Sequence, residues 1–405
     1  MNVRRTAAAT AAAVTAALLA VAAPAAHAAD TPSPSAPASL PSGLYGKKDP
    51  KFDGVFRQSY ALLAQDTVGV KPAQKAVDWL TGQQCDSGGF AAFRADPSEA
   101  CDAKTQVDSN STAAAVQALT ALGGQDATVK KAVSWLKSVQ NQDGGWGYNP
   151  GLPTDANSTG IVVGALAAAG EKPQAVKSQK GKSAYDALPK LALSCDKGED
   201  GAFGLADMKT GKLAANADAT AAGVLGSLGD GLVVKAAEKQ SPAKCAEPGD
   251  VRQAAKNGAA YLADTLAKDG HLKSSMPGAE DQPDYGNTAD AVVALSAAGL
   301  TDQTKKPVEW LQQNSAKWAK ENGPAAYSQL IFAAHATGAD PRDFGGTDLV
   351  KALNATGPAP EKAAAADSEK KDDGGGVPWW IIGVFFVASV GIGFLISGRK
   401  KKTQL

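Results

Sequence analysis

An internal repeat constrains this chain more than any other feature of its sequence. Residues 75–90, "KAVDWLTGQQCDSGGF", and residues 131–146, "KAVSWLKSVQNQDGGW", align over 16 positions without a gap. Both contain Trp-Leu, then a glutamine, then a glycine two positions before an aromatic residue. Weaker copies occur at residues 194–203, 257–272 and 306–314. A unit that recurs along a chain is typical of folds built from stacked supersecondary repeats, so the sequence has to be interpreted as a whole.

A second element alternates with the first. Each copy opens with polar residues and a threonine, continues with small apolar residues and stops at a glycine. This pattern predicts a helix with capping residues at its start and a glycine after its end. The clear copies are residues 108–124, 155–170, 216–230 and 284–299, and the looser ones are residues 53–65 and 325–338.

Helices of the two kinds alternate six times. The second kind should start near residues 53, 108, 155, 216, 284 and 325, and the first kind near 72, 127, 183, 250, 303 and 345. Because the second kind is apolar nearly all round, it should be buried, whereas the first carries charged residues on one face. The polar capping repeats of an open solenoid are not evident. We therefore expect one all-α domain over residues 44–356, an (α/α)6 toroid of inner and outer helices.

The turn after each outer helix holds the most distinctive residues of the repeat. Its glycines give the backbone room to reverse. Its glutamine amide can bond to helix-end backbone groups and so tie neighbouring repeats together. We expect the aromatic residue that follows to pack inside the fold rather than to contact a ligand. The repeat residues expected to be structural are Trp79, Gln84, Phe90, Trp135, Gln140, Trp146 and Trp310.

The motif Gln140-x3-Gly144-x-Trp146 resembles the repeat of squalene–hopene cyclases and of prenyltransferase β-subunits. Those cyclases carry an Asp-x-Asp-Asp-Thr-Ala motif whose middle Asp protonates an alkene. The matching residue is Asn110 in one copy and Asn157 in another, and an amide has no carboxylic proton to give. Asp218 is the one acid found at this middle position of the motif among the copies. The resemblance therefore implies that a cyclase-like enzyme would use Asp218 as its acid.

The resemblance to prenyltransferases implies a zinc ion held by Asp, Cys and His. His271 and His335 are the histidines that remain after the first 28 residues, and neither has a nearby thiol at ligand spacing, so no metal site is expected. The toroid also resembles the barrel domain of cobalamin carriers, which bind without catalysis. No cofactor is predicted, although this last resemblance leaves a corrinoid-like ligand open.

Both ends of the chain predict export and membrane anchoring. Residues 1–28 have the basic start, apolar stretch and small-residue cleavage site of a signal peptide, and residues 29–43 form a Pro/Ser-rich linker. Residues 377–397 hold no charge, and at about 1.5 Å per residue they would span the roughly 30 Å hydrocarbon core of a bilayer. The basic residues 398–405 should stay in the cytoplasm. A flexible tether, residues 357–376, would hold the toroid outside the cell membrane.

The cysteines and the charge balance narrow the chemistry further. Four cysteines in an exported chain favour two disulfides over a metal site. Three pairings are open, and the loop spacings favour Cys85–Cys101 and Cys195–Cys245. Lys plus Arg and Asp plus Glu number 41 each, so nothing indicates a nucleic-acid partner.

Two functions fit these observations. The first is a membrane-anchored extracytoplasmic module that binds a ligand or a partner, such as a transporter or another envelope protein. The alternative is a terpenoid-cyclase- or prenyltransferase-like enzyme, which the degenerate acid motif disfavours. In either case we expect polar residues at the starts of the inner helices to form one mouth above an Ala-lined, roomy barrel. These binding candidates are Asp53, Asp108, Asn110, Asp155, Asn157, Asn216, Asp218, Asp284, Tyr285 and Tyr327.

Overall fold

The computed structural model describes residues 40–195, 201–207, 210–275 and 281–362. Contacts within the chain separate Met1–Pro41 from Ser42–Leu405, and all the described helices belong to the second unit. The expected signal peptide, the membrane-spanning segment 377–397 and the basic tail 398–405 lie outside the described residues. Within the described ranges, no helix has the length and apolar character needed to cross a membrane.

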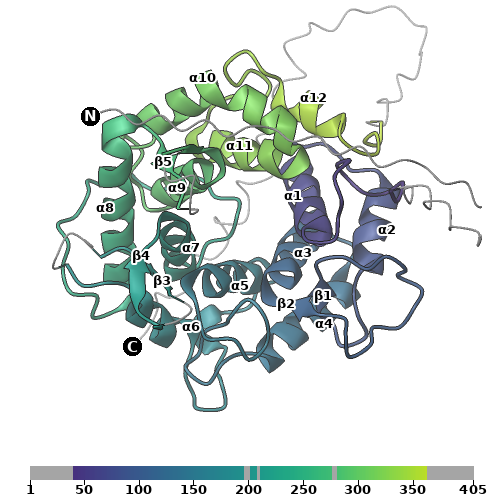
Figure 1. Cartoon of the computed structure of the whole chain (residues 1–405), viewed down its shortest axis with the longest axis horizontal. Coiled ribbons are helices and arrows are strands. Elements are labelled where there is room, and N and C mark those ends of the chain that lie inside the picture. Colours follow the sequence, from purple (N-terminus) through teal and green to yellow (C-terminus); the bar gives the residue numbers. More distant parts are fainter. Residues whose placement is uncertain (1–39, 196–200, 208–209, 276–280, 363–405) are drawn as a thin grey trace, which may run out of the picture. The chain divides into compact units, whose positions relative to one another are not determined.

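Six helices form a closed inner ring (Figure 1). Each contacts the next in chain order, and the last contacts the first. The helical toroid that the repeat predicts is therefore confirmed. The inner helices are α1 (Gly54–Thr67), α3 (Ser109–Leu122), α5 (Ala156–Ala168), α7 (Ala217–Leu228), α9 (Tyr285–Ala297) and α11 (Pro324–Thr337).

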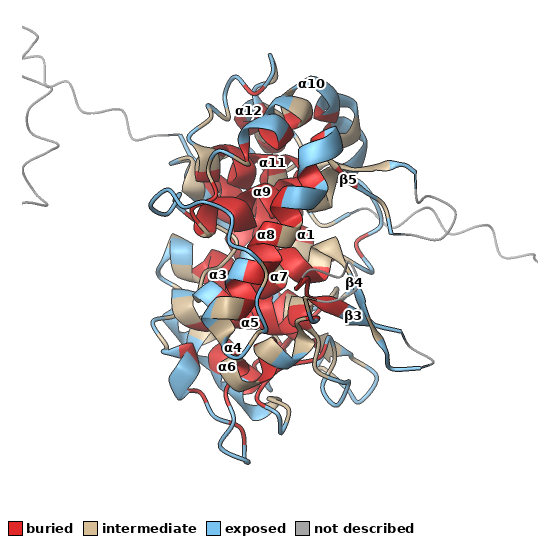
Figure 2. Cartoon of the chain, turned by 90° about the vertical axis from the view of Figure 1, so that its left-hand side faces the viewer, coloured by how far each residue is buried: buried red, intermediate tan, exposed pale blue. Residues whose placement is uncertain are grey.

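A second set of helices lies outside this ring. These are α2 (Gln74–Gly82), α4 (Asp126–Ser138), α6 (Ala184–Ala187), α8 (Val251–Asp269), α10 (Lys305–Asn322) and α12 (Leu349–Asn354). In Figure 2 the inner helices are almost wholly buried, whereas α4 and α10 each turn an exposed face to solvent. The third outer helix is much shorter than its neighbours. After four residues α6 passes into a 3-10 turn, Leu188–Leu191, where Pro189 lacks the backbone N–H that an α-helix needs.

Side-chain caps explain where four of the inner helices begin. Asp108, Asp155, Asn216 and Asp284 each accept a hydrogen bond from the backbone N–H three residues further on, at 2.6 to 3.1 Å. These bonds satisfy N–H groups that have no partner inside the helix. The predicted caps therefore act as caps on α3, α5, α7 and α9.

A recurring hydrogen bond explains why threonine belongs to the repeat. The N–H of Phe90 donates to Thr112 Oγ1 at 2.9 Å, and the N–H of Trp146 donates to Thr159 Oγ1 at 3.0 Å. The same bond joins Phe203 to Thr220 and Leu272 to Thr288, both at 3.0 Å. Each turn is thereby fixed to the inner helix that follows it.

Trp146 packs inside the fold, as expected. Its ring is fully buried, and its Nε1 donates to the carbonyl oxygen of Leu136 at 2.8 Å. Gln84 ties two repeats together, because its amide donates to Gly88 within its own turn and to Thr128 at the next outer helix, both at 2.9 Å. Gln140 departs from this expectation, since its amide donates to Gly144 in its own turn at 2.7 Å.

Three short antiparallel hairpins interrupt the all-α pattern that the sequence predicts. They pair β1 (Phe90–Ala91) with β2 (Val107–Asp108), β3 (Gly204–Ala206) with β4 (Leu213–Ala215), and β5 (Leu272–Lys273) with β6 (Pro283–Asp284). Each hairpin leads from a repeat turn into the capping residue of an inner helix. The strands are only two or three residues long, too short to leave a periodic signal in the sequence.

The ring is sealed where the two ends of the toroid meet. The Tyr45 hydroxyl donates to Gln65 Oε1 at 3.0 Å and to the carbonyl oxygen of Pro358 at 3.1 Å. Glu361 forms an ion pair with Lys71 at 2.7 Å and donates its N–H to the carbonyl of Lys71 at 3.0 Å. The toroid therefore extends past residue 356, where we expected a flexible tether to begin.

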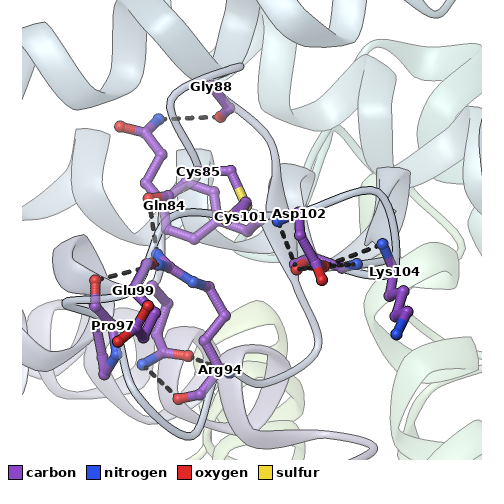
Figure 3. Close-up of a disulfide and its surroundings, with 12 residues drawn as sticks. Gln84, Cys85, Gly88, Arg94, Pro97, Glu99, Cys101, Asp102 and Lys104 are labelled. Carbon is purple, nitrogen blue, oxygen red and sulfur yellow. Dashed lines mark hydrogen bonds between the residues drawn. A yellow bond between two sulfur atoms is a disulfide. The ribbon is translucent and has the colours of Figure 1, made fainter.

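Two disulfides join Cys85 to Cys101 and Cys195 to Cys245, the pairs that the loop spacings favour. Figure 3 shows how Arg94 organises the loop closed by the first bridge. Its guanidinium donates to the carbonyl oxygens of Gly82, Gln84 and Pro97 at 3.0 to 3.2 Å, and also to that of Glu99. The arginine thus satisfies carbonyl groups on both sides of the loop.

Candidate active site

The predicted mouth forms where the inner helices begin. Asn110 Nδ2 donates to Asn157 Oδ1 at 3.5 Å, and Asn157 Nδ2 donates to Asp218 Oδ2 at 2.6 Å. These residues sit at the starts of α3, α5 and α7, so the hydrogen bonds join three neighbouring helix ends. The chain of amides ends on a carboxylate that faces the interior of the barrel.

A cavity of about 240 Å³ lies inside the barrel directly below this mouth. Asn157, Asp218, Asn287, Asp290 and Gln329 supply its polar wall. Its apolar wall comes from Phe56, Tyr60, Ile161, Ala221, Ala222, Leu225, Leu232, Val293 and Phe332. The expectation of a roomy, Ala-lined barrel is therefore wrong in its detail. Three aromatic rings narrow the space, and two of them, Tyr60 and Phe332, meet edge to face with centroids 5.5 Å apart.

The segment after α7 forms the floor of the cavity. The N–H of Leu232 donates to Gln117 Oε1 at 2.8 Å, and the Leu232 side chain lines the cavity. Gly231 lies against Gly164 so closely that a Cβ on Gly164 would collide with it. The same segment continues to α9, where the N–H of Ala237 donates to the carbonyl oxygen of Ser296 at 3.0 Å. It thus crosses between helices of the ring at the end opposite to the mouth.

Asp290, on α9, is a strongly perturbed acid of the cavity. Burial first, and the nearby negative charges of Asp218 and Asp284 in addition, raise its pKa to about 8, against the opposing effect of a hydrogen bond from Gln329. Gln329 Nε2 donates to Asp290 Oδ2 at 2.9 Å. At neutral pH this carboxyl therefore keeps its proton, and its other oxygen is available to carry it.

Asp218, on the neighbouring helix α7, lines the same cavity. Burial raises the pKa of Asp218, and the negative charges of Asp284 and Asp155 raise it further, while the hydrogen bond from Asn157 lowers it. The amide donor favours the charged form of this carboxyl. The phenol of Tyr60, which also lines the cavity, has a pKa well above 10 because it is buried near Asp290 and Asp218, so it keeps its proton.

The other predicted residues are distributed around the mouth rather than inside the cavity. Asp108, Asp155, Asn216 and Asp284 are occupied as helix caps. Asp53 accepts from Arg57 Nη1 at 3.1 Å. Tyr285 belongs to an aromatic stack outside the cavity, with ring centroids 4.9 Å from Trp310 and 5.4 Å from Trp318. Tyr327 lines a different groove.

Sequence reasoning missed Asp290 and Gln329. Asp290 occupies a repeat position that holds Ala114, Ile161 and Ala222 in the other three clear copies, and Gln329 in the looser copy at residues 325–338. An ionisable residue at a position that is apolar in the other clear copies was the signal that could have found it. No group of three or more metal-ligating His, Cys, Asp or Glu side chains comes together in the described part of the chain.

Comparison with known proteins agrees with this architecture. Residues 56–232 match the model of the prenyltransferase alpha-alpha toroid domain. This part of the chain therefore resembles the toroids of prenyltransferases and squalene-cyclase-like proteins. The matched residues cover the first four inner helices, including Asp218 but not Asp290.

A drimenyl diphosphate synthase from Streptantibioticus cattleyicolor is 38% identical to this chain over 73 residues. The alignment covers 16% of this chain and 14% of the synthase, so it reaches about a seventh of that enzyme's length.

Solved structures show likenesses at low sequence identity. A protein from Actinoplanes is 15% identical, with a TM-score of 0.46 over 74% of this chain and 94% of its own. The type II terpene cyclase MstE from Scytonema is 13% identical, with a TM-score of 0.43 over 67% of this chain and 74% of its own.

Proposed function

We propose that the toroid is a terpenoid-cyclase-like enzyme in which Asp290 protonates an alkene bound in the central cavity. The observation that carries this proposal is a pair of carboxyls, Asp290 and Asp218, in one apolar cavity. Asp290 holds its proton at neutral pH, which is the property that a general acid needs. This assignment replaces Asp218, the acid that the repeat motif implies.

The chemistry begins with proton transfer from the carboxyl of Asp290. Its O–H bond breaks, a C–H bond forms at one alkene carbon, and the other alkene carbon becomes cationic. Neighbouring double bonds of the substrate can then attack that cation and close a ring. The hydrogen bond from Gln329 to Oδ2 stabilises the carboxylate that the transfer leaves behind. The final cation loses a proton, so atoms and charge balance over the reaction.

The cavity walls suit the cationic intermediates of this reaction. The faces of aromatic rings attract a cation, and Phe56, Tyr60 and Phe332 all line the cavity. The hydrogen bond from Asn157 favours the negatively charged form of Asp218, which lines the same cavity. The cavity volume of about 240 Å³ exceeds the roughly 150 Å³ that accommodates benzene in an engineered apolar cavity, and it falls below a usual drug-sized pocket. A short prenyl chain fits this size best.

Deuterium incorporation tests the proposal directly. The full chain would be incubated in D2O with linear prenyl alcohols and prenyl diphosphates of graded length, and the products analysed by mass spectrometry. We expect a cyclic product that carries one deuterium at the protonated carbon. Asp290→Asn should lower the rate by about 10²–10⁴-fold, the usual contribution of a general acid.

Asp264→Asn, which changes an exposed carboxyl on α8, is the matched control and should cyclise at the wild-type rate. Product without deuterium, or equal activity in the Asp290→Asn variant, would exclude Asp290 as the proton donor. Absence of product from every prenyl substrate would exclude the cyclase function itself.

We also propose that the toroid acts outside the cell membrane, from the signal-peptide-like start and the apolar segment 377–397 of the sequence. The two disulfides fit an oxidising compartment. A membrane anchor would hold the mouth close to a source of apolar substrate, or to a transporter or another envelope protein. Protease added to intact spheroplasts should remove the toroid, and a toroid that survives this treatment would contradict the topology.

A further inference from the structure

A second cavity, here called the seam groove, lies where the ring closes. It has a volume of about 570 Å³ and shares no lining residue with the central cavity. Its walls come from residues 46–48, the start of α1, the end of α10, the start of α11 and the end of α12.

The start of α11 differs from the starts of α3, α5, α7 and α9, because no side chain caps it. Gly323 occupies the capping position with a φ of 73°, and Pro324 follows. The first N–H groups of a helix have no partner within the helix and carry the positive end of its dipole. At α11 this positive end opens onto the seam groove without a carboxylate or amide to satisfy it.

Tyr327 gives the groove a hydrogen-bond donor on a side chain that is mostly buried. Its side chain is only 8% exposed, it lines the groove, and its hydroxyl has no hydrogen-bond partner among the described residues. The hydroxyl oxygen is not among the described buried atoms that lack a partner, so it is accessible from the groove. It is therefore free to donate a hydrogen bond to a group from outside the chain.

The charges on the groove favour an anion. Lys47, Lys48 and Lys320 line it, and within the described residues none of the three forms an ion pair. Arg57 also lines the groove, but its charge is balanced by Asp53 at 3.1 Å. The remaining acid of the groove, Glu321, lies 3.9 Å from Lys317. The groove thus keeps a net positive charge around the free hydroxyl and the uncapped helix start.

We propose that the seam groove binds the phosphate group of a phosphorylated ligand. Phosphate oxygens would accept hydrogen bonds from the Tyr327 hydroxyl and from the free N–H groups at the start of α11, with the lysine ammonium groups around them. The groove is much larger than a phosphate ion, and Gly46, Pro324, Ala352 and Ala355 give it an apolar wall. The ligand is therefore a phosphate ester with an organic body rather than inorganic phosphate alone.

Calorimetric titration of the full chain in detergent with phenyl phosphate tests the site. We expect saturable binding that weakens as the salt concentration rises. Tyr327→Phe removes one hydrogen bond to a charged group and should weaken binding about tenfold. Tyr261→Phe, at a half-buried tyrosine on α8, is the matched control and should bind like the wild type.

Lys320→Ala changes an exposed side chain and keeps the test decisive even if Tyr327→Phe were to disturb folding. It should weaken binding about twofold to fivefold at low salt. Unchanged binding in both variants, or no binding by the wild type, would overturn the proposal. The binding test and the cyclase test can have different outcomes. Asp290→Asn leaves the seam groove unchanged, so this variant should still bind phenyl phosphate like the wild type.

Competition identifies the source of the phosphate. A short-chain phosphatidic acid and glycerol 1-phosphate would each be used to displace phenyl phosphate. Stronger displacement by phosphatidic acid assigns the groove to a lipid headgroup, and stronger displacement by glycerol 1-phosphate assigns it to a soluble ester. Failure of both to displace phenyl phosphate would contradict a phosphate site.

Discussion

Helices α5 and α7 begin with the same two functional groups in opposite order. On α5 the carboxyl of Asp155 caps the helix, and the amide of Asn157 comes two residues later. On α7 the amide of Asn216 caps the helix, and the carboxyl of Asp218 comes two residues later. Since Asn216 satisfies the N–H of Ala219 at 2.8 Å, Asp218 has no capping role. The exchange of Asp and Asn therefore places a carboxyl in the wall of the cavity rather than at a helix cap.

The exchange also pairs the two helices. The amide of Asn157 is placed to donate to Asp218 at 2.6 Å, which stabilises the charge of Asp218. That charge in turn is one cause of the raised pKa of Asp290. The pKa of Asp290 thus depends on the charge of Asp218. The charge of Asp218 depends in turn on the amide of Asn157 from the neighbouring repeat. Substitutions at these positions can separate the contributions of Asn157, Asp218 and Asp290.

The largest effect is expected from Asp290→Asn on stability as a function of pH. Below about pH 4 the carboxyl is protonated in both the folded and the unfolded chain, so it has no effect on stability. Between about pH 4 and pH 8 the unfolded chain loses this proton while the folded chain keeps it, so the wild type is destabilised as the pH rises. The total destabilisation is at most about 6 kcal/mol, from the difference between a pKa of 3.8 and one of about 8.

The asparagine variant has no such proton. Its free energy of unfolding should equal that of the wild type near pH 4 and exceed it by a growing margin up to pH 8, in urea unfolding experiments. Wild-type turnover should fall as the pH rises through about 8, because Asp290 ionises. A stability difference that does not change with pH would show that Asp290 is not protonated in the folded chain.

The reciprocal exchange Asn216→Asp with Asp218→Asn should give a smaller effect and bears directly on the comparison. It gives α7 the order of groups found on α5. Asp and Asn are similar as N-caps, so the free energy of unfolding should change by less than about 1 kcal/mol. Because the charge at position 218 is lost, the pKa of Asp290 should fall, and the alkaline limit of turnover should move to lower pH.

The control for this double variant is the single variant Asn216→Asp, which keeps the carboxyl of Asp218 in the cavity. Its alkaline limit should not move to lower pH. If the double variant and this single variant share one pH profile, then the charge of Asp218 has no influence on Asp290.

The sequence predicts the ring well because its determinants are local. Apolar periodicity, a cap such as Asp108 and a following glycine lie within a few residues of each other, so each helix start can be located without knowledge of the fold. The closing of the ring follows from six alternations of the two helix types. The shortening of α6 was also visible in principle, since Pro189 lies inside the expected helix.

The active-site geometry could not be predicted in the same way. Which face of an inner helix points to the barrel axis depends on packing with both neighbours, and this alone places Asp290 in the cavity and Tyr327 outside it. The floor comes from Leu232, in a connection that has no repeat pattern. The motif places an acid at Asp218. Which of the two carboxyls, Asp218 or Asp290, holds a proton depends on how deeply each is buried and on the charge of the other.

The smallest effects are expected from the two amides, Asn157 and Asn110, and their contrast tests the hydrogen-bonded chain at the mouth. Asn157→Ala removes a 2.6 Å hydrogen bond to a carboxylate, so we expect a loss of about 1.5–3 kcal/mol in the free energy of unfolding. Asn110→Ala removes only a 3.5 Å contact, and the buried Oδ1 of Asn110 has no partner among the described residues. Loss of that unsatisfied atom offsets the loss of the contact, so the change should stay within about 0.5 kcal/mol. Urea unfolding at pH 7 measures both, and equal losses in the two variants would mean that the bond from Asn157 to Asp218 has no special role.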